Sequence, residues 1–250
     1  MKYDLVLLDA DGTLFDFDAA AAEAFRASCA EAGLDAASRF GDSAEGLTLF
    51  ERYLEVNHGV WAELERGEID KESLKTERFR RLFSERRLGT DAAKFGERYL
   101  ERLAEGAQLL PGAEDFVRKL TEAGCALAIV TNGISQVQRG RFYRSPLAAL
   151  ISDLLISEEL GAEKPAAAFF SEAFRRIGRP ETRKEGVVVV GDSWSADIAG
   201  AVGFGLDALW FNAARKARPA GGIAPAQDAV RPPVIYEAAT YAEALAILGM

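Results

Sequence analysis

Five short apolar runs, separated by longer amphipathic segments, constrain the fold of this 250-residue chain more than any other feature. Each run is followed by polar or turn-forming residues, which is typical of strands buried on both faces. The runs are residues 5–8, 126–130, 154–156, 187–190 and 208–211. Helical patterns lie between the later runs, at residues 113–123, 135–150, 166–177 and 196–202. This alternation predicts an α/β fold, a Rossmann-like three-layer core in which helices cover both faces of a parallel sheet.

One long segment interrupts the alternation directly after the first strand. Residues 16–108 contain no strand-like run, and their apolar residues recur at helical spacing. The repeating sets are Phe25, Cys29 and Ala32; Leu47, Phe50, Leu54 and Trp61; and Leu74, Phe79, Leu82 and Phe83. The pattern predicts an inserted helical-bundle domain of residues 16–108 within a core of residues 1–15 and 109–250.

The C-terminal part of the chain is less regular. Residues 213–233 contain Pro219, Pro225, Pro232 and Pro233, which indicate a loop. We expect one last short strand at Val234 and Ile235, followed by a closing helix over Tyr241–Leu248.

Composition excludes several classes of partner. There are 30 Lys and Arg against 39 Asp and Glu, a formal net charge of −9, whereas nucleic-acid and anionic membrane surfaces need clustered basic residues. No apolar run reaches the roughly 18 residues of a membrane span. Cys29 and Cys125 are too few for a disulfide framework, and the N-terminal sequence does not resemble a signal peptide. We therefore expect a cytoplasmic protein, as a monomer or homodimer, that binds neither membranes nor nucleic-acid polymers.

The first candidate site follows the first apolar run. Asp9 and Asp11 are two residues apart and precede Gly12, which permits a sharp turn. Such a carboxylate pair can divide the roles of nucleophile and general acid or base. The alternative is an ordinary turn in which both carboxylates bind their own backbone.

Polar residues also follow two further runs. Thr131, Asn132 and Gly133 come after the second run and could form an anion cradle, or an ordinary turn in which Ser135 caps the next helix. Lys164 precedes a proline at the start of a predicted helix, where it is either an anion-binding group or a surface lysine.

The fourth site follows the valine run. Asp192 and Asp197 lie after Gly191, and their carboxylates suit Mg²⁺, although either could simply cap a helix. Because ligands bind outside the carboxyl ends of parallel strands, these four features should converge at one edge of the sheet.

In this order, the four motifs resemble those of the haloacid dehalogenase-like hydrolase superfamily. The segments are Asp-x-Asp-x-Thr from Asp9, Thr131-Asn132-Gly133, Lys164-Pro165 and Gly191-Asp192 with Asp197. The helical insert stands where that family carries an α-helical cap. Members that dehalogenate lack the second acid of the first motif, so the presence of Asp11 favours phosphoryl transfer.

The resemblance assigns roles to these residues. It implies that Asp9 is the nucleophile and forms an aspartyl-phosphate, while Asp11 serves first as general acid and then as general base. Thr131 and the backbone around Asn132 and Gly133 would hold the phosphoryl oxygens of the substrate.

The resemblance also implies a cofactor. Mg²⁺ would be bound by Asp9, the carbonyl of Asp11 and Asp192, with Asp197 close by. Lys164 would contact the substrate and compensate charge in the reaction. An anionic nucleophile can approach a phosphate only when such cations offset the repulsion.

The segment from Asp9 to Phe17 and parts of the insert resemble a bacterial branch that includes pyrimidine 5′-nucleotidases. Gly12 departs from that branch, in which an acidic residue is common at this place. The expected substrate is therefore a small phosphomonoester, with (deoxy)pyrimidine nucleoside monophosphates favoured and a sugar phosphate, as phosphatase or phosphomutase substrate, the alternative.

Several conspicuous residues of the insert have simpler interpretations. His58 is expected on the surface or packed within the insert, and Trp61 and Phe79 are expected in its core rather than against a nucleobase. The basic residues Arg78, Arg80 and Arg81 are expected on a solvated helix face.

Overall fold

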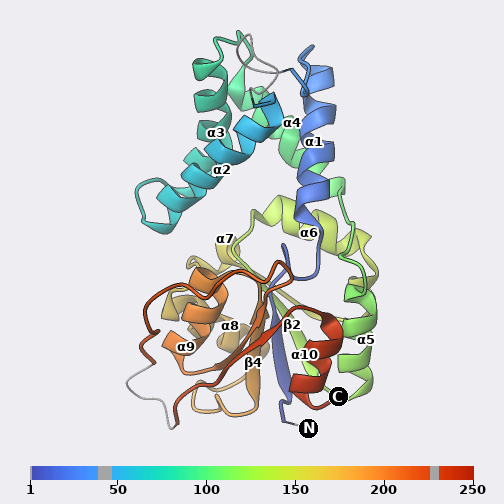
Figure 1. The fold of residues 1–250 in the computed structure, drawn as a ribbon, viewed down its shortest axis with the longest axis vertical. Coiled ribbons are helices and arrows are strands. Elements are labelled where there is room, and N and C mark those ends of the chain that lie inside the picture. Colours follow the sequence, from blue (N-terminus) through green and yellow to red (C-terminus); the bar gives the residue numbers. More distant parts are fainter. Residues whose placement is uncertain (1, 39–46, 226–230) are drawn as a thin grey trace. The chain divides into compact units, whose positions relative to one another are not determined.

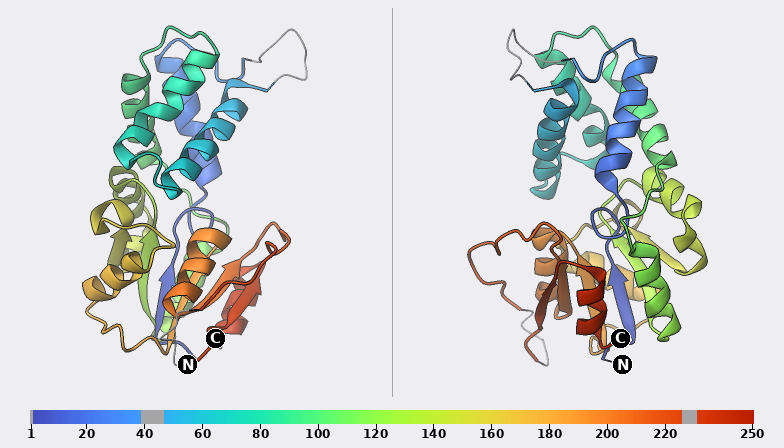
Figure 2. Two further views of the ribbon diagram at one scale, coloured as in Figure 1. Left: turned by 90° about the vertical axis from the view of Figure 1, so that its left-hand side faces the viewer. Right: turned by 45° about the vertical axis from the view of Figure 1, so that its right-hand side comes forward.

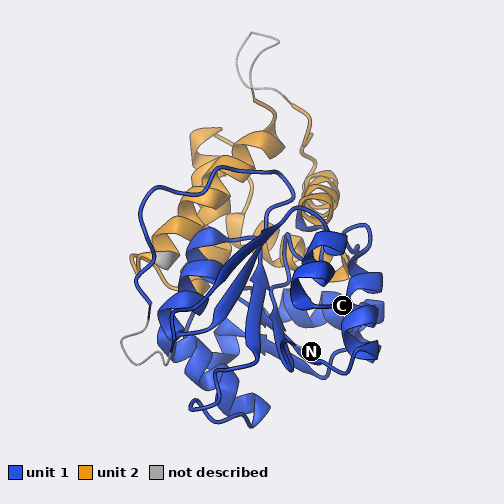
Figure 3. Cartoon of the chain, turned by 60° about the horizontal axis from the view of Figure 1, so that its bottom comes forward, with its two compact units in different colours: residues 1–17, 107–250 blue, residues 18–106 orange. Residues whose placement is uncertain are grey.

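The computed structural model describes residues 2–38, 47–225 and 231–250, so part of the expected insert, residues 39–46, lies outside the described residues. The chain divides into two compact units, coloured separately in Figure 3. Unit 1 comprises residues 1–17 and 107–250, and unit 2 comprises residues 18–106. The chain therefore passes between the units twice, after residue 17 and after residue 106.

Unit 1 is built on a six-stranded parallel sheet with the strand order β3-β2-β1-β4-β5-β6. The strands are β1 (Leu5–Leu8), β2 (Ala126–Thr131), β3 (Asp153–Ile156), β4 (Val187–Gly191), β5 (Asp207–Phe211) and β6 (Ile235–Ala238). The two strands at the centre, β1 and β4, are buried along their whole length. This burial explains why their sequences are continuous apolar runs rather than alternating ones.

Helices cover both faces of this sheet, as Figures 1 and 2 show. Val6 and Leu8 pack with α5 (Ala113–Glu122), α6 (Ser135–Arg144) and α10 (Tyr241–Leu248). Leu5 and Leu7 point to the other face and pack with α8 (Ala167–Ile177) and α9 (Ala199–Phe204). Side chains alternate along a strand, so β1 contributes to both cores. The expected three-layer α/β core is confirmed.

Three elements differ from the sequence prediction. The helix expected over residues 135–150 ends at Arg144, and a 3₁₀ helix (Pro146–Ala149) follows. Pro146 cannot continue an α-helix, and Ser145 before it takes the extended conformation, with φ −93° and ψ 156°. A short helix α7 (Ser157–Leu160) was not expected, and Trp194–Ile198 form a π-helical turn before α9.

Unit 2 consists of α1 (Phe17–Glu31, whose first residue belongs to unit 1), α2 (Leu49–Glu65), α3 (Lys71–Glu85) and α4 (Ala92–Glu105). Thr48 and Asp70 cap α2 and α3 through their side-chain oxygens. Aromatic residues from all four helices form its core. Tyr53 stacks on Phe25 at 4.8 Å and on Phe79 at 5.3 Å between ring centroids.

The expected buried face of α2 is wrong. Leu47, which precedes the helix, and Leu54 are exposed, and Phe50 and Trp61 are half-buried. The residues that α2 buries are Leu49, Tyr53, Val60 and Leu64. These buried residues also recur at helical spacing, and the stacking of Tyr53 decides which of the two competing faces points inward.

Within the described residues, no helix has both the length and the apolar character that a membrane crossing requires.

Candidate active site

The ends of three neighbouring strands bring polar residues to one edge of the sheet. Asp9 directly follows β1, Thr131 ends β2 and Asp192 directly follows β4. β1 lies between the other two strands, so its carboxylate occupies the middle of this edge. Parallel strands end at the same edge, which is the physical basis for the convergence expected from the sequence.

Lys164 lies at the centre of a buried cluster of charged groups that also contains Asp9 and Asp197. Its Nζ donates to Asp9 Oδ1 and to Asp197 Oδ1, both at 2.6 Å, and to the carbonyl oxygen of Val130 at 2.7 Å. The residue is only 2% exposed. The interpretation of Lys164 as a surface lysine is therefore wrong, and its ammonium group lies against two of the predicted site carboxylates.

The second oxygen of Asp197 closes the loop after β4. Asp197 Oδ2 accepts a hydrogen bond from the backbone N–H of Ser193 at 3.0 Å, and the side chain is fully buried. The Trp210 indole donates to the Asp192 carbonyl oxygen at 2.8 Å, and Trp194 packs edge-on against Trp210. Trp194 and Trp210 thus support the backbone that carries Asp192.

Asp9, Asp192 and Asp197 form a group of acids that could hold a metal ion. One carboxylate oxygen from each lies within 4.8 Å of the others. Hard carboxylate oxygens at this spacing are a donor set that Mg²⁺ prefers. The residues present therefore fit this ion.

Burial and mutual repulsion perturb these groups. Burial raises the pKa of Asp9 well above its ordinary value. The negative charge of Asp197 raises this pKa further, and the positive charge of Lys164 only partly offsets the increase. Burial also raises the pKa of Asp192 to about 6, with Asp197 again contributing. For Lys164, burial acts to lower the pKa, but the charges of Asp197 and Asp9 outweigh it and the net shift is upward. The cluster thus concentrates negative charge that a divalent cation would relieve.

The residues after β2 are arranged as a compact turn. Thr131 Oγ1 accepts from the Gly133 N–H at 3.2 Å. The Asn132 side chain accepts from the Lys164 N–H at 2.8 Å and donates to the Lys164 carbonyl at 2.7 Å. Asn132 therefore fixes the backbone of Lys164. Ser135 does not cap α6 through its side chain; its N–H donates to Glu158 instead.

Asp11 points to a different set of partners from the other acids. Its Oδ2 accepts from Gln138 Nε2 at 2.6 Å, and its Oδ1 pairs with the guanidinium of Arg141. Both partners lie on α6 and are buried. Gln138 and Arg141 are not among the residues predicted from the sequence; their one signal is that two polar residues share a face of the helix that follows Gly133.

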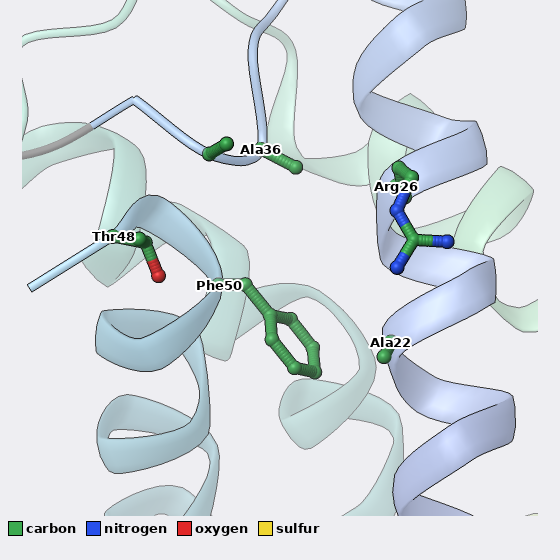
Figure 4. A pocket seen from close by; sticks show the side chains of 6 residues that line it. Ala22, Arg26, Ala36, Thr48 and Phe50 are labelled. Carbon is green, nitrogen blue, oxygen red and sulfur yellow. The ribbon is translucent and has the colours of Figure 1, made fainter.

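The prominent residues of unit 2 have mixed outcomes. His58 is exposed, and Phe79 belongs to the aromatic core as expected. The solvated position expected for Arg78 is wrong: it is 2% exposed and lies beside the rings of Phe79 and Tyr99. Unit 2 also has a hollow of about 200 Å³ lined by small side chains together with Arg26, Thr48 and Phe50 (Figure 4).

The chain is similar to known proteins over most of its length. A pyrimidine 5′-nucleotidase, PynA of Streptococcus pneumoniae, is 35% identical over 212 residues, which cover 85% of both chains. Another, YjjG of Escherichia coli, is 33% identical over 227 residues, covering 90% of this chain and 92% of the relative. The crystal structure of the HAD-hydrolase YfnB from Bacillus subtilis matches the whole of both chains with a TM-score of 0.83 and 31% identity.

The family model of haloacid dehalogenase-like hydrolases matches residues 3–205. This match covers all four sequence motifs and agrees with the parallel sheet and its acidic edge. The chain is an enzyme that belongs to the haloacid dehalogenase-like hydrolase family.

Proposed function

We propose that this protein is a Mg²⁺-dependent phosphomonoester hydrolase that acts through an aspartyl-phosphate at Asp9. The observation that carries this proposal is the buried Asp9 carboxylate, held by Lys164 at 2.6 Å beside Asp192 and Asp197. A nucleophilic carboxylate, an ammonium group and further hard oxygen ligands at one sheet edge are what phosphoryl transfer requires.

The reaction has two half-reactions in this proposal. An oxygen of Asp9 attacks phosphorus, the bond from phosphorus to the leaving oxygen breaks, and Asp11 gives that oxygen a proton. Water then attacks phosphorus, Asp11 takes a proton from it, and the bond from phosphorus to Asp9 breaks. Each proton that leaves Asp11 is thus replaced in the second half-reaction.

The substrate's phosphoryl group would lie between Asp9 and the turn after β2. Thr131 and the backbone of Asn132 and Gly133 would bind its oxygens, and Lys164 would offset its charge. Asp9, the Asp11 carbonyl, Asp192 and Asp197 would hold Mg²⁺, which when bound neutralises negative charge on the transferring group.

We propose that the substrates are (deoxy)pyrimidine nucleoside monophosphates. Two relatives that this chain matches over most of their length are pyrimidine 5′-nucleotidases, which supports this choice over a sugar phosphate. Unit 2 would act as the cap that selects the substrate, and the chain would hinge near residues 16–18 and 106–112. The YfnB structure, which is bound to magnesium, is described as revealing interdomain movement. We also propose a cytoplasmic location, with which the buried thiols of Cys29 and Cys125 agree.

The test is phosphate release from a panel of phosphomonoesters that contains UMP, dUMP, dTMP, purine nucleotides and sugar phosphates. The proposal expects the pyrimidine nucleotides to have the highest kcat/KM, EDTA to stop the reaction and added Mg²⁺ to restore it. Faster turnover of sugar phosphates would reject the nucleotide assignment. Full activity in EDTA after removal of bound metal would reject the metal dependence.

A further inference from the structure

We propose that Gln138 and Arg141 are positioning residues for Asp11, which together fix its carboxylate for proton transfer to the leaving group. This inference rests on the proposed function, because it concerns the part of Asp11 in that reaction. It is carried by side-chain contacts within unit 1, between Asp11 and two residues of α6.

The two residues hold both oxygens of one carboxylate. Gln138 Nε2 donates to Asp11 Oδ2 at 2.6 Å, and the Arg141 guanidinium pairs with Asp11 Oδ1. Gln138 and Arg141 are three residues apart on α6, so they lie on the same face of the helix. With one donor on each oxygen, the Asp11 side chain has a single defined orientation.

The donors are themselves fixed by their surroundings. Arg141 is fully buried, and its guanidinium lies 4.7 Å from the centroid of the Phe15 ring and 5.9 Å from that of Phe17. Gln138 is 2% exposed and packs directly against Gly133. A methyl group at residue 133 would lie 2.4 Å from Gln138 Cγ, so only glycine leaves room for this contact.

Burying Arg141 costs desolvation that a surface ion pair largely avoids. A fully buried arginine loses its hydration and needs a well-defined partner. The Asp11 side chain, in contrast, is 27% exposed, so a substrate can reach it while the buried Gln138 and Arg141 fix its orientation. General acids are effective only when held within a few tenths of an ångström of the proton-transfer geometry.

The test separates positioning from a merely structural role by varying the leaving group. From a nucleotide, the leaving group is the nucleoside alkoxide, which needs a proton. From p-nitrophenyl phosphate, it is the stable p-nitrophenolate, which does not. The ratio kcat/KM reports the steps up to departure of this group, so a defect in the general acid affects the nucleotide selectively.

Gln138→Met and Arg141→Met remove each donor and keep an unbranched apolar chain in its place. We expect each to lower kcat/KM for UMP about 100-fold while changing kcat/KM for p-nitrophenyl phosphate less than about 3-fold. Arg141→Lys, which keeps a charged donor, should recover part of the UMP activity. Arg144→Met is the matched control on the same helix, because Arg144 is exposed and its side chain donates to the Gly140 carbonyl rather than to Asp11; it should change neither value.

Equal losses for both substrates in the Gln138 variant would overturn the proposal and leave the pair a structural role. Unchanged or increased activity on UMP would overturn it as well, because Asp11 would then not need to be held. If Arg141→Met does not fold, as judged by circular dichroism, the neutral Gln138→Met substitution decides the question. Absence of activity in the wild-type enzyme on every phosphomonoester would instead be a failure of the proposed function.

Discussion

At the scale of single residues, the site depends on positions where a side chain would displace a carboxylate. A Cβ at Gly191 would lie 2.2 Å from Asp197 Oδ2, and one at Gly12 would lie 2.7 Å from Asp192 Oδ2. Gly12 also has a φ of +81°, which disfavours other residues. At Gly12 and Gly191 the backbone therefore lies so close to the acidic residues that only glycine leaves room for them.

Gly191→Ala tests this close approach. The added methyl group should push Asp197 from Lys164 and from the Ser193 N–H, and so lower both Mg²⁺ affinity and kcat at least 10-fold, an effect of about 1.4 kcal/mol. Isothermal titration calorimetry and phosphate release measure the two quantities. Gly203→Ala is the matched control: this helical glycine is exposed and has open space around it, so the substitution should be neutral or slightly stabilising. Wild-type Mg²⁺ affinity in Gly191→Ala would contradict the argument.

The residues at the strand ends could be predicted from the sequence, but the contacts between their side chains could not. Asp9, Lys164 and Asp197 meet because β1 and β4 are neighbours in the sheet and the loop between α7 and α8 places Lys164 beside them. The contacts of Gln138 and Arg141 with Asp11 could not be predicted, because they depend on how α6 rotates against the sheet. Arg78 was misjudged because a basic residue on a helix is most often solvated.

At the scale of elements, hydrogen bonds of buried side chains hold the last strand, β6, in place at the edge of the sheet. The segment that leads into β6 is held to the start of β5 by Asp207. The buried carboxylate of Asp207 accepts from the Tyr3 hydroxyl at 2.7 Å, from the Val234 N–H at 2.8 Å and from Arg231 at 2.7 Å. The sequence predicted only a short strand at this place, two residues long and starting one residue earlier.

Asp207 gives the fold a defined acid sensitivity. Burial alone would raise its pKa, but the hydrogen bonds from Arg231, Val234 and Tyr3 outweigh burial and the net shift is downward. A lowered folded-state pKa stabilises the protein above the unfolded-state value, about 3.9, and this contribution is lost as the pH falls through the folded-state value.

Asp207→Asn should therefore lower the free energy of unfolding by about 2 kcal/mol at pH 7 and by progressively less below about pH 4. Chemical unfolding at pH 7 and pH 3 measures this difference. Asp4→Asn is the control, since Asp4 pairs with Arg179 but its side chain is 64% exposed, and its loss should cost less than about 1 kcal/mol. An equal effect of Asp207→Asn at both pH values would contradict the linkage.

The helix α3 carries a buried cation in the core of unit 2. Within the described residues, the hydrogen-bond partners of Arg78 are neutral: Asn57 Oδ1 at 3.0 Å and the Tyr53 hydroxyl at 3.4 Å. The adjacent rings of Phe79 and Tyr99 stabilise the guanidinium, with centroids at 5.0 and 5.1 Å. Arg78 lies four residues from both Leu74 and Leu82, so its helical spacing already places it on the buried face of α3.

Arg78→Ala should lower the free energy of unfolding by about 2–4 kcal/mol, since it leaves a cavity and an unsatisfied Asn57 oxygen. The double variant Asn57→Leu with Arg78→Met should recover most of this loss, because removing both polar partners avoids unsatisfied groups. Thermal and urea unfolding measure both. Arg80→Ala, on the exposed face of the same helix, should leave stability nearly unchanged. A double variant no more stable than Arg78→Ala would show that the polar contacts themselves are needed.

At the scale of the whole molecule, the order of elements was largely predictable, and so were the buried faces of α1 and α3, but the buried face of α2 was not. The apolar runs gave the strands of the sheet because burial on both faces leaves a clear pattern, and the 16–108 segment gave helices because no strand-like run interrupts it. The end of the helix at Arg144 follows from the local signal of Pro146, whereas the inward face of α2 depends on tertiary packing, which periodicity alone does not resolve. The net charge of −9 describes the chain as a whole, whereas the site acids form a local cluster around Lys164.

The central claim is that Asp9 is the nucleophile of a phosphomonoesterase. Phosphate release from UMP with Mg²⁺ should be measured for the wild-type enzyme, for Asp9→Asn and for the control Asp115→Asn, whose residue is exposed on α5. The account predicts a loss of kcat of about 10³-fold or more in Asp9→Asn, with normal folding by circular dichroism, and wild-type turnover in Asp115→Asn. Normal turnover by Asp9→Asn would contradict it.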